Sequence, residues 1–281
     1  MFEAIKKEHG NEASYECREI NNVVIDGVLF TESTLRAAVR NNPYTRLNMC
    51  LDVIFGKKKL NILEVGVNQG KLIESILPRK DGVEVYAVEP NPDVITDLQK
   101  KFPPNVHIYN IGLGNKTGEG ILHITKEARN SSQFKPNMNS VHLKRENFQK
   151  TGLDGFEVVK TAPFRIVEGD WLLKKIGIDE IDLMSVNTQG SEFQILEGTK
   201  NFLSSGRVKS ILIENDLDDR YLGAKDDFAD QQLFLRDNGF KLFDFILIRD
   251  LMPVGIRRIY PLYIHESADP ERHVAQKSSK R

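Results

Sequence analysis

The chain lacks the features that mark several large classes of protein. It has two cysteines in 281 residues, Cys17 and Cys50, and neither lies near a cluster of histidines. This usage predicts neither a disulfide nor a metal site, and is typical of a reduced, intracellular protein. No run approaches the roughly 18 apolar residues that a membrane helix needs, and the N-terminus is too polar for a signal peptide. We therefore expect a cytoplasmic protein with no membrane partner.

The chain also lacks an excess of either charge. It carries 39 Lys and Arg residues against 40 Asp and Glu residues. A balanced total gives no electrostatic reason for binding nucleic acid, so no nucleic-acid partner is expected. Hydrophobic residues make up 40% of the chain, which is enough for one large buried core.

Apolar runs alternate with helical patterns along most of the chain. Strands are predicted at residues 60–65, 83–88, 106–111, 181–186, 208–213, 241–248 and 257–264. Helices are predicted at residues 71–77, 92–102, 192–203 and 228–238. This alternation predicts an α/β fold with a mostly parallel, seven-stranded sheet and helices on both faces. The last two strands have no helix between them, so one of them is expected to be antiparallel.

The chain is predicted to divide into three parts. Residues 1–57 are expected to form a helical extension, with a break or kink near Pro43. Residues 58–265 form the main domain, and residues 266–281 form a flexible polar tail. A polar stretch at residues 126–150 is long enough to act as a lid. Whether the N-terminal extension serves a homodimer interface or a substrate pocket is left open.

A glycine-containing loop follows the first predicted strand. Gly66 and Gly70 allow a sharp turn and let a ligand approach the main chain without meeting a Cβ atom. Asn68 replaces the middle glycine of the dinucleotide pattern, which disfavours a nicotinamide dehydrogenase. Glu64 suits a ligand with positive charge better than a diphosphate.

An acidic residue ends the second predicted strand. Glu89 lies 19 residues after Gly70, the position at which related folds bind the hydroxyls of a ribose. A carboxylate accepts hydrogen bonds from both hydroxyls at once. The alternative role for Glu89 is that of an exposed acid at a helix start.

Six segments in this order resemble the FkbM family of S-adenosylmethionine-dependent methyltransferases. They span residues 65–70, 88–92, 111–119, 181–192, 196–198 and 211–214, so the resemblance covers roughly residues 60–250. It implies a Rossmann-like class I methyltransferase fold with S-adenosylmethionine as the cofactor. It also implies O-methylation of a sugar or natural product, and therefore a small-molecule or glycan acceptor. Some relatives methylate nitrogen.

The resemblance implies a set of cofactor-binding residues. Those near the methionine end are Glu64, Gly66 and Asn68, and Glu89 holds the ribose. The backbone at Ile111 and Gly112 lines the adenine. The full predicted set is Glu64, Gly66, Asn68, Gly70, Glu89, Ile111, Gly112 and Asn187.

The chain departs from the family pattern after the fourth predicted strand. The family usually has Lys-Ile-Asp-Val-Glu-Gly where this chain has Ser-Val-Asn-Thr-Gln-Gly at residues 185–190. The amides of Asn187 and Gln189 cannot take a proton at neutral pH and are poor ligands for a divalent cation. A metal-dependent mechanism is therefore not expected.

Acidic and imidazole side chains remain as candidates for the catalytic base. Glu192 is the first candidate, because it follows the amide loop at the expected edge of the sheet. Its alternative role is that of an ordinary acid in the first turn of a helix. His142 lies in the polar stretch and titrates near neutrality. Glu214 and Asp216 follow the fifth predicted strand and are expected to face the same crevice.

Three functions remain open at this point. The first is O-methylation of a hydroxyl on a sugar or natural product. The second is N-methylation of a side-chain amide or amine. The third is a cofactor-binding protein without catalysis that acts as a scaffold, which the loss of two carboxylates motivates.

Overall fold

The computed structural model describes residues 42–140, 143, 153–224, 227–251 and 255–270, of which residues 249–251 are described in backbone only. It also describes the backbone of four short N-terminal strands. The chain divides into two compact units, Met1–Met49 and Cys50–Arg281.

The N-terminal unit contains two hairpins. Strand β1 (Ala4–His9) pairs antiparallel with β2 (Glu12–Cys17), and β3 (Asn22–Ile25) pairs antiparallel with β4 (Val28–Thr31). The described part of the expected helical extension, residues 1–57, therefore contains strands as well as a helix. Valine and isoleucine are frequent in β3 and β4, and such β-branched residues favour strands over helices.

The N-terminal unit also contains the start of helix α2 (Pro43–Phe55), which ends in the second unit. The Asn42 side chain accepts hydrogen bonds from the backbone N–H groups of Tyr44 and Thr45, which caps the helix. Pro43 is the first helical residue, where its missing N–H costs nothing. The predicted kink at Pro43 is therefore a helix start.

The second unit is built on an eight-stranded sheet. The strand order is β13-β15-β12-β11-β5-β6-β7, and β14 pairs with β15. The five strands from β12 to β7 are parallel, and β15 runs antiparallel to its three neighbours. The bounds are β5 (Leu60–Val65), β6 (Val83–Val88), β7 (Val106–Tyr109), β11 (Ile181–Val186), β12 (Val208–Ile213), β13 (Asn215–Asp216), β14 (Phe240–Leu251) and β15 (Gly255–His265).

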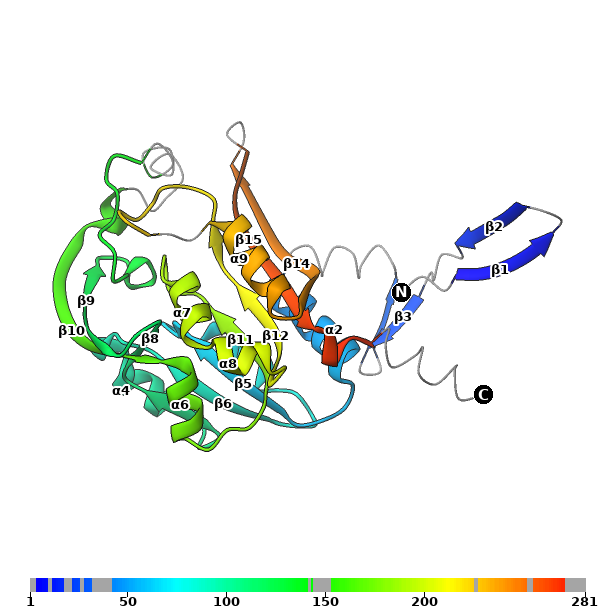
Figure 1. Cartoon of the computed structure of the whole chain (residues 1–281), viewed down its shortest axis with the longest axis horizontal. Coiled ribbons are helices and arrows are strands. Elements are labelled where there is room, and N and C mark those ends of the chain that lie inside the picture. The colour runs from blue at the N-terminus through cyan, green and yellow to red at the C-terminus, as the bar shows by residue number, and fades with distance from the viewer. Residues whose placement is uncertain are drawn as a thin grey trace. The chain divides into compact units, whose positions relative to one another are not determined.

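This sheet confirms the predicted α/β class. All seven predicted strands are present, and the two-residue strand β13 is an addition. From β5 the chain crosses the sheet toward β6 and β7, through α3 (Lys71–Ile76) and α4 (Pro92–Lys101). From β11 it crosses in the opposite direction to β12, through α7 (Glu192–Gly198) and α8 (Lys200–Ser204). Because such crossovers are right-handed, opposite directions place these helices on opposite faces of the sheet (Figure 1).

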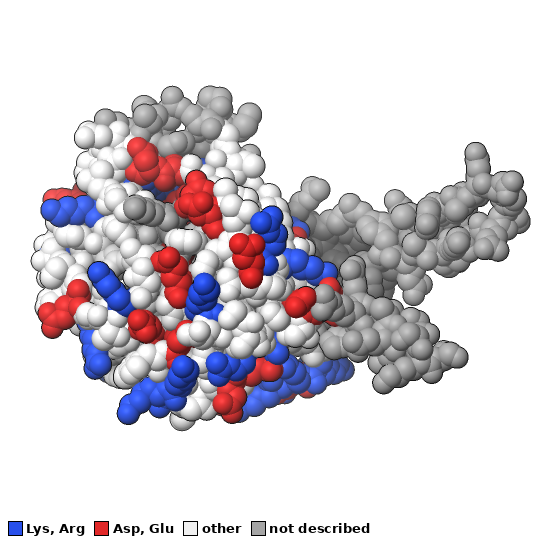
Figure 2. Space-filling view, in the orientation of Figure 1, with Lys and Arg blue, Asp and Glu red and all other residues white. Residues whose placement is uncertain are grey.

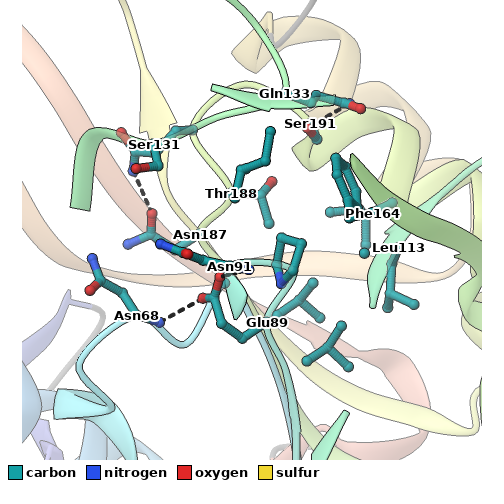
Figure 3. A pocket seen from close by; sticks show the side chains of 18 of the residues that line it. Asn68, Glu89, Asn91, Leu113, Ser131, Gln133, Phe164, Asn187, Thr188 and Ser191 are labelled. Carbon is teal, nitrogen blue, oxygen red and sulfur yellow. Dashed lines mark hydrogen bonds between the residues drawn. The ribbon is translucent and has the colours of Figure 1, made fainter. Parts of the chain in front are cut away.

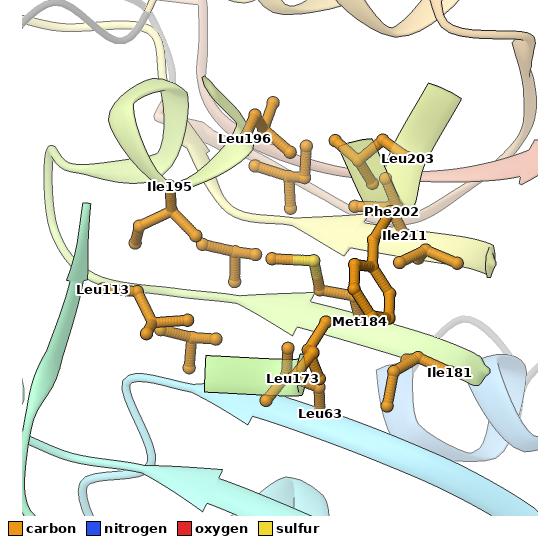
Figure 4. Packing of buried hydrophobic residues seen from close by; sticks show 14 of the residues in the cluster. Leu63, Leu113, Leu173, Ile181, Met184, Ile195, Leu196, Phe202, Leu203 and Ile211 are labelled. Carbon is orange, nitrogen blue, oxygen red and sulfur yellow. The ribbon is translucent and has the colours of Figure 1, made fainter. Parts of the chain in front are cut away.

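The larger core lies between the sheet and four helices. Leu63 and Met184 point from the strands into this core, and Phe202 reaches it from α8 (Figure 4). Helices α6 (Gly169–Lys175) and α9 (Phe228–Asp237) complete the layer with α7 and α8. Burying each such side chain fully stabilises the fold by about 1.5–3 kcal/mol. The core thus fixes the positions of the strand ends that form the site.

A second, three-stranded sheet was not predicted. Strands β8 (Gly112–Gly114), β9 (Gly118–Thr125) and β10 (Val158–Glu168) are inserted between β7 and β11, in the order β8-β10-β9. Most residues of β10 are exposed or half-buried, so the strand has no continuous apolar run for sequence analysis to detect. Within residues 126–150, the predicted lid, short helix η1 (Ala128–Asn130) follows β9 directly.

The remaining features concern the tail and the surface. A short helix, η4 (Glu266–Ala268), occupies the start of the predicted flexible tail, and residues 271–281 lie outside the described residues.

On the described part of the face in Figure 2, acidic and basic side chains are interspersed. None of the described helices is long and apolar enough to cross a membrane.

Candidate functional site

The candidate site lies where the order of the parallel strands reverses. Strand β5 has β6 on one side and β11 on the other, and ligands in open α/β sheets bind beyond the carboxyl ends of strands at such a point. Backbone hydrogen bonds continue past these strand ends. The Gly66 N–H donates to the carbonyl of Val88 at 2.9 Å, and the Asn187 N–H donates to the carbonyl of Val65 at 2.9 Å.

A cavity that is open to solvent occupies this point. We call it the glycine-loop cavity. It is lined by Val65, Gly66, Asn68, Val88, Glu89, Pro90, Asn91, Gly112, Leu113, Leu122, Ala128, Arg129, Ser131, Gln133, Phe164, Asn187, Thr188, Gln189, Ser191 and Ile195 (Figure 3). One wall comes from the ends of β5, β6 and β11, and the opposite wall from the three-stranded sheet and the loop that follows β9.

The glycine loop presses closely against the end of β11. Gly66 has φ of 87°, and a Cβ atom there would collide with the backbone carbonyl oxygen of Asn187. Asn68 also has a left-handed backbone, with φ of 49°. A residue other than glycine adopts this conformation at a cost, and such residues gather at functional sites.

Glu89 is oriented by the two loops beside it. Its Oε2 accepts a hydrogen bond from the Asn68 backbone N–H at 2.8 Å, and its Oε1 accepts one from the Asn91 backbone N–H at 2.8 Å (Figure 3). The Asn91 side chain caps α4 by accepting a hydrogen bond from the Asp93 backbone N–H. Burial raises the pKa of Glu89, and the backbone N–H groups of Asn68, Asn91 and Val67 oppose this rise. The carboxylate is thus held rigidly at the floor of the cavity.

A second cavity, also open to solvent, lies beside the first. We call it the acidic cavity. Its acidic lining residues are Glu192, Glu214, Asp216, Asp218, Asp219 and Asp227. The two cavities share Gln189. Among the described residues, no group of three or more histidine, cysteine or acidic side chains is arranged to hold a metal ion.

Two buried arginines neutralise part of the acidic cavity. Arg258 pairs with Glu214 and with Asp216, and its Nη2 lies 3.2 Å from the Asp216 Oδ2. Arg220 pairs with Asp216 at 3.3 Å and with Asp218 at 3.0 Å. Burial raises the pKa of Glu214, and the charge of Arg258 opposes the rise.

Five of the predicted cofactor-binding residues line the glycine-loop cavity: Gly66, Asn68, Glu89, Gly112 and Asn187. The other three do not line it. Glu64 is 6% exposed, and its Oε2 has no hydrogen-bond partner among the described residues. Burial, and then the charge of Glu89, raise the pKa of Glu64 well above the ordinary value. Gly70 is the N-cap of α3, and Ile111 is half-buried against the larger core.

The two predicted bases are placed differently. Glu192 is 2% exposed and lines the acidic cavity. Its Oε1 accepts a hydrogen bond from the Thr188 backbone N–H at 2.6 Å, and its Oε2 accepts one from the Gly190 backbone N–H at 2.8 Å. His142 lies outside the described residues. Glu214 and Asp216 line the same cavity as Glu192.

Sequence analysis missed the wall that faces the glycine loop. Phe164 comes from β10, which gave no strand signal. Ser131 and Gln133 belong to the stretch predicted as a lid, but nothing in the sequence singled them out. The Gln133 Nε2 donates to the Ser191 Oγ at 2.8 Å, which ties this wall to the loop after β11 (Figure 3).

Comparison with known families identifies this arrangement. The sequence profile of the Methyltransferase FkbM domain matches residues 64–242, which include both the glycine loop and the amide loop. The chain belongs to the FkbM methyltransferase family. It is therefore an S-adenosylmethionine-dependent methyltransferase, which confirms the family, the enzyme class and the cofactor that the sequence predicted.

Several solved methyltransferase structures are similar to this chain at low identity. The magnesium protoporphyrin IX methyltransferase from Synechocystis PCC 6803 is 10% identical, with 83% of this chain and 82% of that chain covered and a TM-score of 0.41. The 1,6-didemethyltoxoflavin-N1-methyltransferase from Burkholderia thailandensis is 12% identical, with 87% and 94% covered and a TM-score of 0.42. A search of curated proteins finds no match to the chain.

Proposed function

We propose that this methyltransferase transfers the methyl group to a hydroxyl oxygen of a sugar or natural product. The observation that carries the proposal is the pair of cavities that share Gln189. The glycine-loop cavity suits the cofactor, and the acidic cavity suits an acceptor with many hydroxyl groups, because carboxylates accept hydrogen bonds from hydroxyls.

The residues of the glycine-loop cavity fit S-adenosylmethionine chemically. Glu89 has both oxygens oriented and accepts hydrogen bonds from the two ribose hydroxyls. Two buried acceptor atoms, Glu64 Oε2 and Asn68 Oδ1, have no hydrogen-bond partner among the described residues. In our proposal the Asn68 Oδ1, on the cavity wall, serves the cofactor's ammonium group directly, Glu64 acts on that group without lining the cavity, and Gly112 lies against the adenine. When bound, the cofactor supplies an electrophilic methyl group, so the protein contributes alignment and exclusion of water.

In the proposed reaction, the acceptor oxygen forms a bond to the methyl carbon as the bond between carbon and sulfur breaks. The electron pair stays on sulfur, and the hydroxyl proton must leave the acceptor oxygen. We propose Glu214 as the base. It lines the acidic cavity beside Gln189, and a raised pKa brings a carboxylate closer to the proton affinity that such a base needs.

Glu192 and His142 remain alternative bases, as predicted from the sequence. The hydrogen bonds from Thr188 and Gly190 to Glu192 support a positioning role for this carboxylate. Glu192→Gln removes one acceptor and puts an amide N–H against a backbone N–H. If Glu192 positions the loop, cofactor affinity and turnover fall together. A fall in turnover alone, with the affinity for S-adenosylhomocysteine unchanged, would make Glu192 the base.

N-methylation of an amine is the second candidate function. The lining of the acidic cavity favours this function. It has six carboxylates, and no lysine or arginine is among the described residues that line the cavity. Such a lining attracts a cationic acceptor as well as a polyhydroxylated one. The two functions predict different products, since O-methylation gives an ether or ester and N-methylation gives a substituted amine.

The first test is calorimetric binding of S-adenosylhomocysteine to the wild type and to Glu89→Ala. We expect the loss of two charge-assisted hydrogen bonds to weaken binding by about 2–3 kcal/mol. Glu119→Ala, at an exposed position on β9, is the control and should bind as the wild type does. Equal affinities of wild type and Glu89→Ala would contradict the ribose role.

The second part of the test identifies the acceptor. Isotopically labelled methyl transfer is measured against glycosides and polyols in one panel and against amines in another, with mass spectrometry of the products. Transfer to the first panel alone supports O-methylation, and transfer to the second alone replaces it with N-methylation. The predicted cytoplasmic location and homodimer are also proposals, which cell fractionation and light scattering test.

A further inference from the structure

Gln189 holds an unusual position between the two cavities. Its φ is 60°, a left-handed value that costs energy for a residue with a side chain, and it is 8% exposed. Its backbone carbonyl accepts a hydrogen bond from the Ser132 Oγ at 2.7 Å. The strain is retained because the surrounding structure holds this residue in place, which points to a specific task for its side chain.

The side-chain amide of Gln189 bridges the two cavities by hydrogen bonds. Its Nε2 donates to the Asn187 Oδ1 at 2.7 Å and to the Glu214 Oε2 at 3.1 Å. Its Oε1 lies 3.1 Å from the hydroxyl of Tyr221, which also lies 3.0 Å from the backbone carbonyl of Asn130. An ionised carboxylate only accepts hydrogen bonds, and Arg258 pairs with Glu214. The nitrogen of Gln189 must therefore be the atom that faces Glu214.

This orientation determines which atom of Asn187 faces the glycine-loop cavity. Because the Asn187 Oδ1 accepts the hydrogen bond from Gln189, its Nδ2 is left for the cavity (Figure 3). That nitrogen carries two N–H groups and no acceptor. The end of β11 therefore presents hydrogen-bond donors to the ligand.

We propose that Gln189 is a positioning residue that turns the N–H groups of Asn187 toward the carboxylate of the bound cofactor. The inference rests on the proposed location of the cofactor in the glycine-loop cavity. Asn187 lies directly beside Gly66, on the same wall as Asn68 and Glu89. The carboxylate of the cofactor needs hydrogen-bond donors, and the acidic residues nearest to this wall offer no donor when they are ionised.

The test uses Gln189→Glu with two ligands. S-Adenosylhomocysteine has the amino-acid carboxylate, and 5′-methylthioadenosine lacks the whole amino-acid part. A carboxylate at position 189 accepts from Asn187, so the Asn187 amide must reverse and present its oxygen to the cavity. We expect at least a tenfold loss of affinity for S-adenosylhomocysteine at pH 8, and less than a twofold change for 5′-methylthioadenosine, by calorimetry.

The pH dependence distinguishes positioning from a structural role. Once protonated, the carboxyl group introduced by Gln189→Glu donates to Asn187 and restores the original orientation. The variant should therefore regain affinity relative to the wild type as the pH falls from 8 to 5. The charged groups around this position are Glu214, with Arg258 and Asp216 behind it. Glu214 raises the pKa of a neighbouring acid, which brings the change into this range.

Gln189→Met is the matched control for packing. It removes the hydrogen bonds without reversing Asn187, so its loss of affinity for S-adenosylhomocysteine should be smaller and independent of pH. If Gln189→Glu does not fold, Asn187→Asp presents an oxygen to the cavity and should show the same selectivity between the two ligands. Equal losses for both ligands, or no loss, would overturn the proposal. Failure of the wild type to bind S-adenosylhomocysteine would instead overturn the proposed cofactor site.

Discussion

The glycine-loop cavity and the acidic cavity meet at Gln189, yet they are built in different ways. The first is based on two short strand-loop-helix segments, after β5 and after β6, in which neighbouring residues make the contacts. The second brings together the loop after β11, the segment after β12 and the start of α9, and its charges are balanced by Arg258 from β15. Local geometry shapes the wall of the first cavity that carries the glycine loop, and long-range ion pairs shape the second cavity.

The difference predicts which substitutions reduce the stability of the fold and which reduce the binding of the cofactor. The acidic cavity depends on buried counter-charges, so the loss of a cation there should destabilise the fold. The glycine-loop cavity depends on backbone geometry and on oriented acceptors. Changes there should alter the binding of the cofactor more selectively.

The largest effect is expected for Arg258→Met in the acidic cavity. It leaves Glu214 buried without its cation and leaves Asp216 with Arg220 alone, which should lower the free energy of unfolding by about 3–5 kcal/mol in a urea titration. The loss should shrink as the pH falls, because protonated Glu214 needs no counter-charge. Lys160→Met is the control, since it breaks an exposed pair with Asp93 and should cost less than about 1 kcal/mol. Similar losses for both variants would contradict the role given to buried charge.

The next effect is expected for Gly66→Ala in the glycine loop. The new Cβ atom meets the carbonyl oxygen of Asn187 at a backbone φ of 87°, so we expect a loss of about 3 kcal/mol in stability and no measurable binding of S-adenosylhomocysteine. Gly177→Ala is the matched control. Its φ is 72°, but no atom lies within 4 Å of the new Cβ, so the cost should be about 1 kcal/mol, with binding retained. Retained binding in Gly66→Ala would show that the loop is not held against β11.

The smallest effect, and a gain, is expected for Glu64→Gln. Burial raises the pKa of Glu64 above the ordinary value of 4.5, so the folded state binds this proton more tightly than the unfolded state does. The wild type therefore loses stability as the pH rises from about 4.5 through the raised pKa. The neutral variant should be more stable by about 1–2 kcal/mol at pH 8, and equal near pH 4.5, in urea titrations. Its affinity for S-adenosylhomocysteine should fall. A stability difference that does not change with pH would contradict this account.

The strands of the main sheet were predictable because each is a short, buried run with its own periodicity. The predicted bounds of β5, β6, β11 and β12 match the structure, and β14 and β15 are longer than predicted. Strand β10 was missed because most of its residues are partly exposed, and its partners lie far along the chain. The hairpins of residues 4–31 were missed because β1 and β2 are largely polar and β3 and β4 are only four residues long.

The candidate site divides in the same way. Gly66, Asn68 and Glu89 stand at fixed spacings in one continuous stretch, so the sequence alone indicated that they meet. Phe164 and Tyr221 carry no such pattern, because they reach the cavities from segments that only folding brings near. The acid Glu192 was visible in the sequence, but the backbone N–H groups that occupy its oxygens were not.

The sequence by itself determined the strands of the main sheet, the glycine loop and the family to which this methyltransferase belongs, because these depend on residues close together in the chain. Only the tertiary structure decided that Gln189 separates two cavities and that its amide nitrogen faces Glu214. The physical reason is that hydrogen bonds and ion pairs are set by distances of a few ångströms in space. The chain separates these partners by 25 residues or more, and no local pattern records their approach.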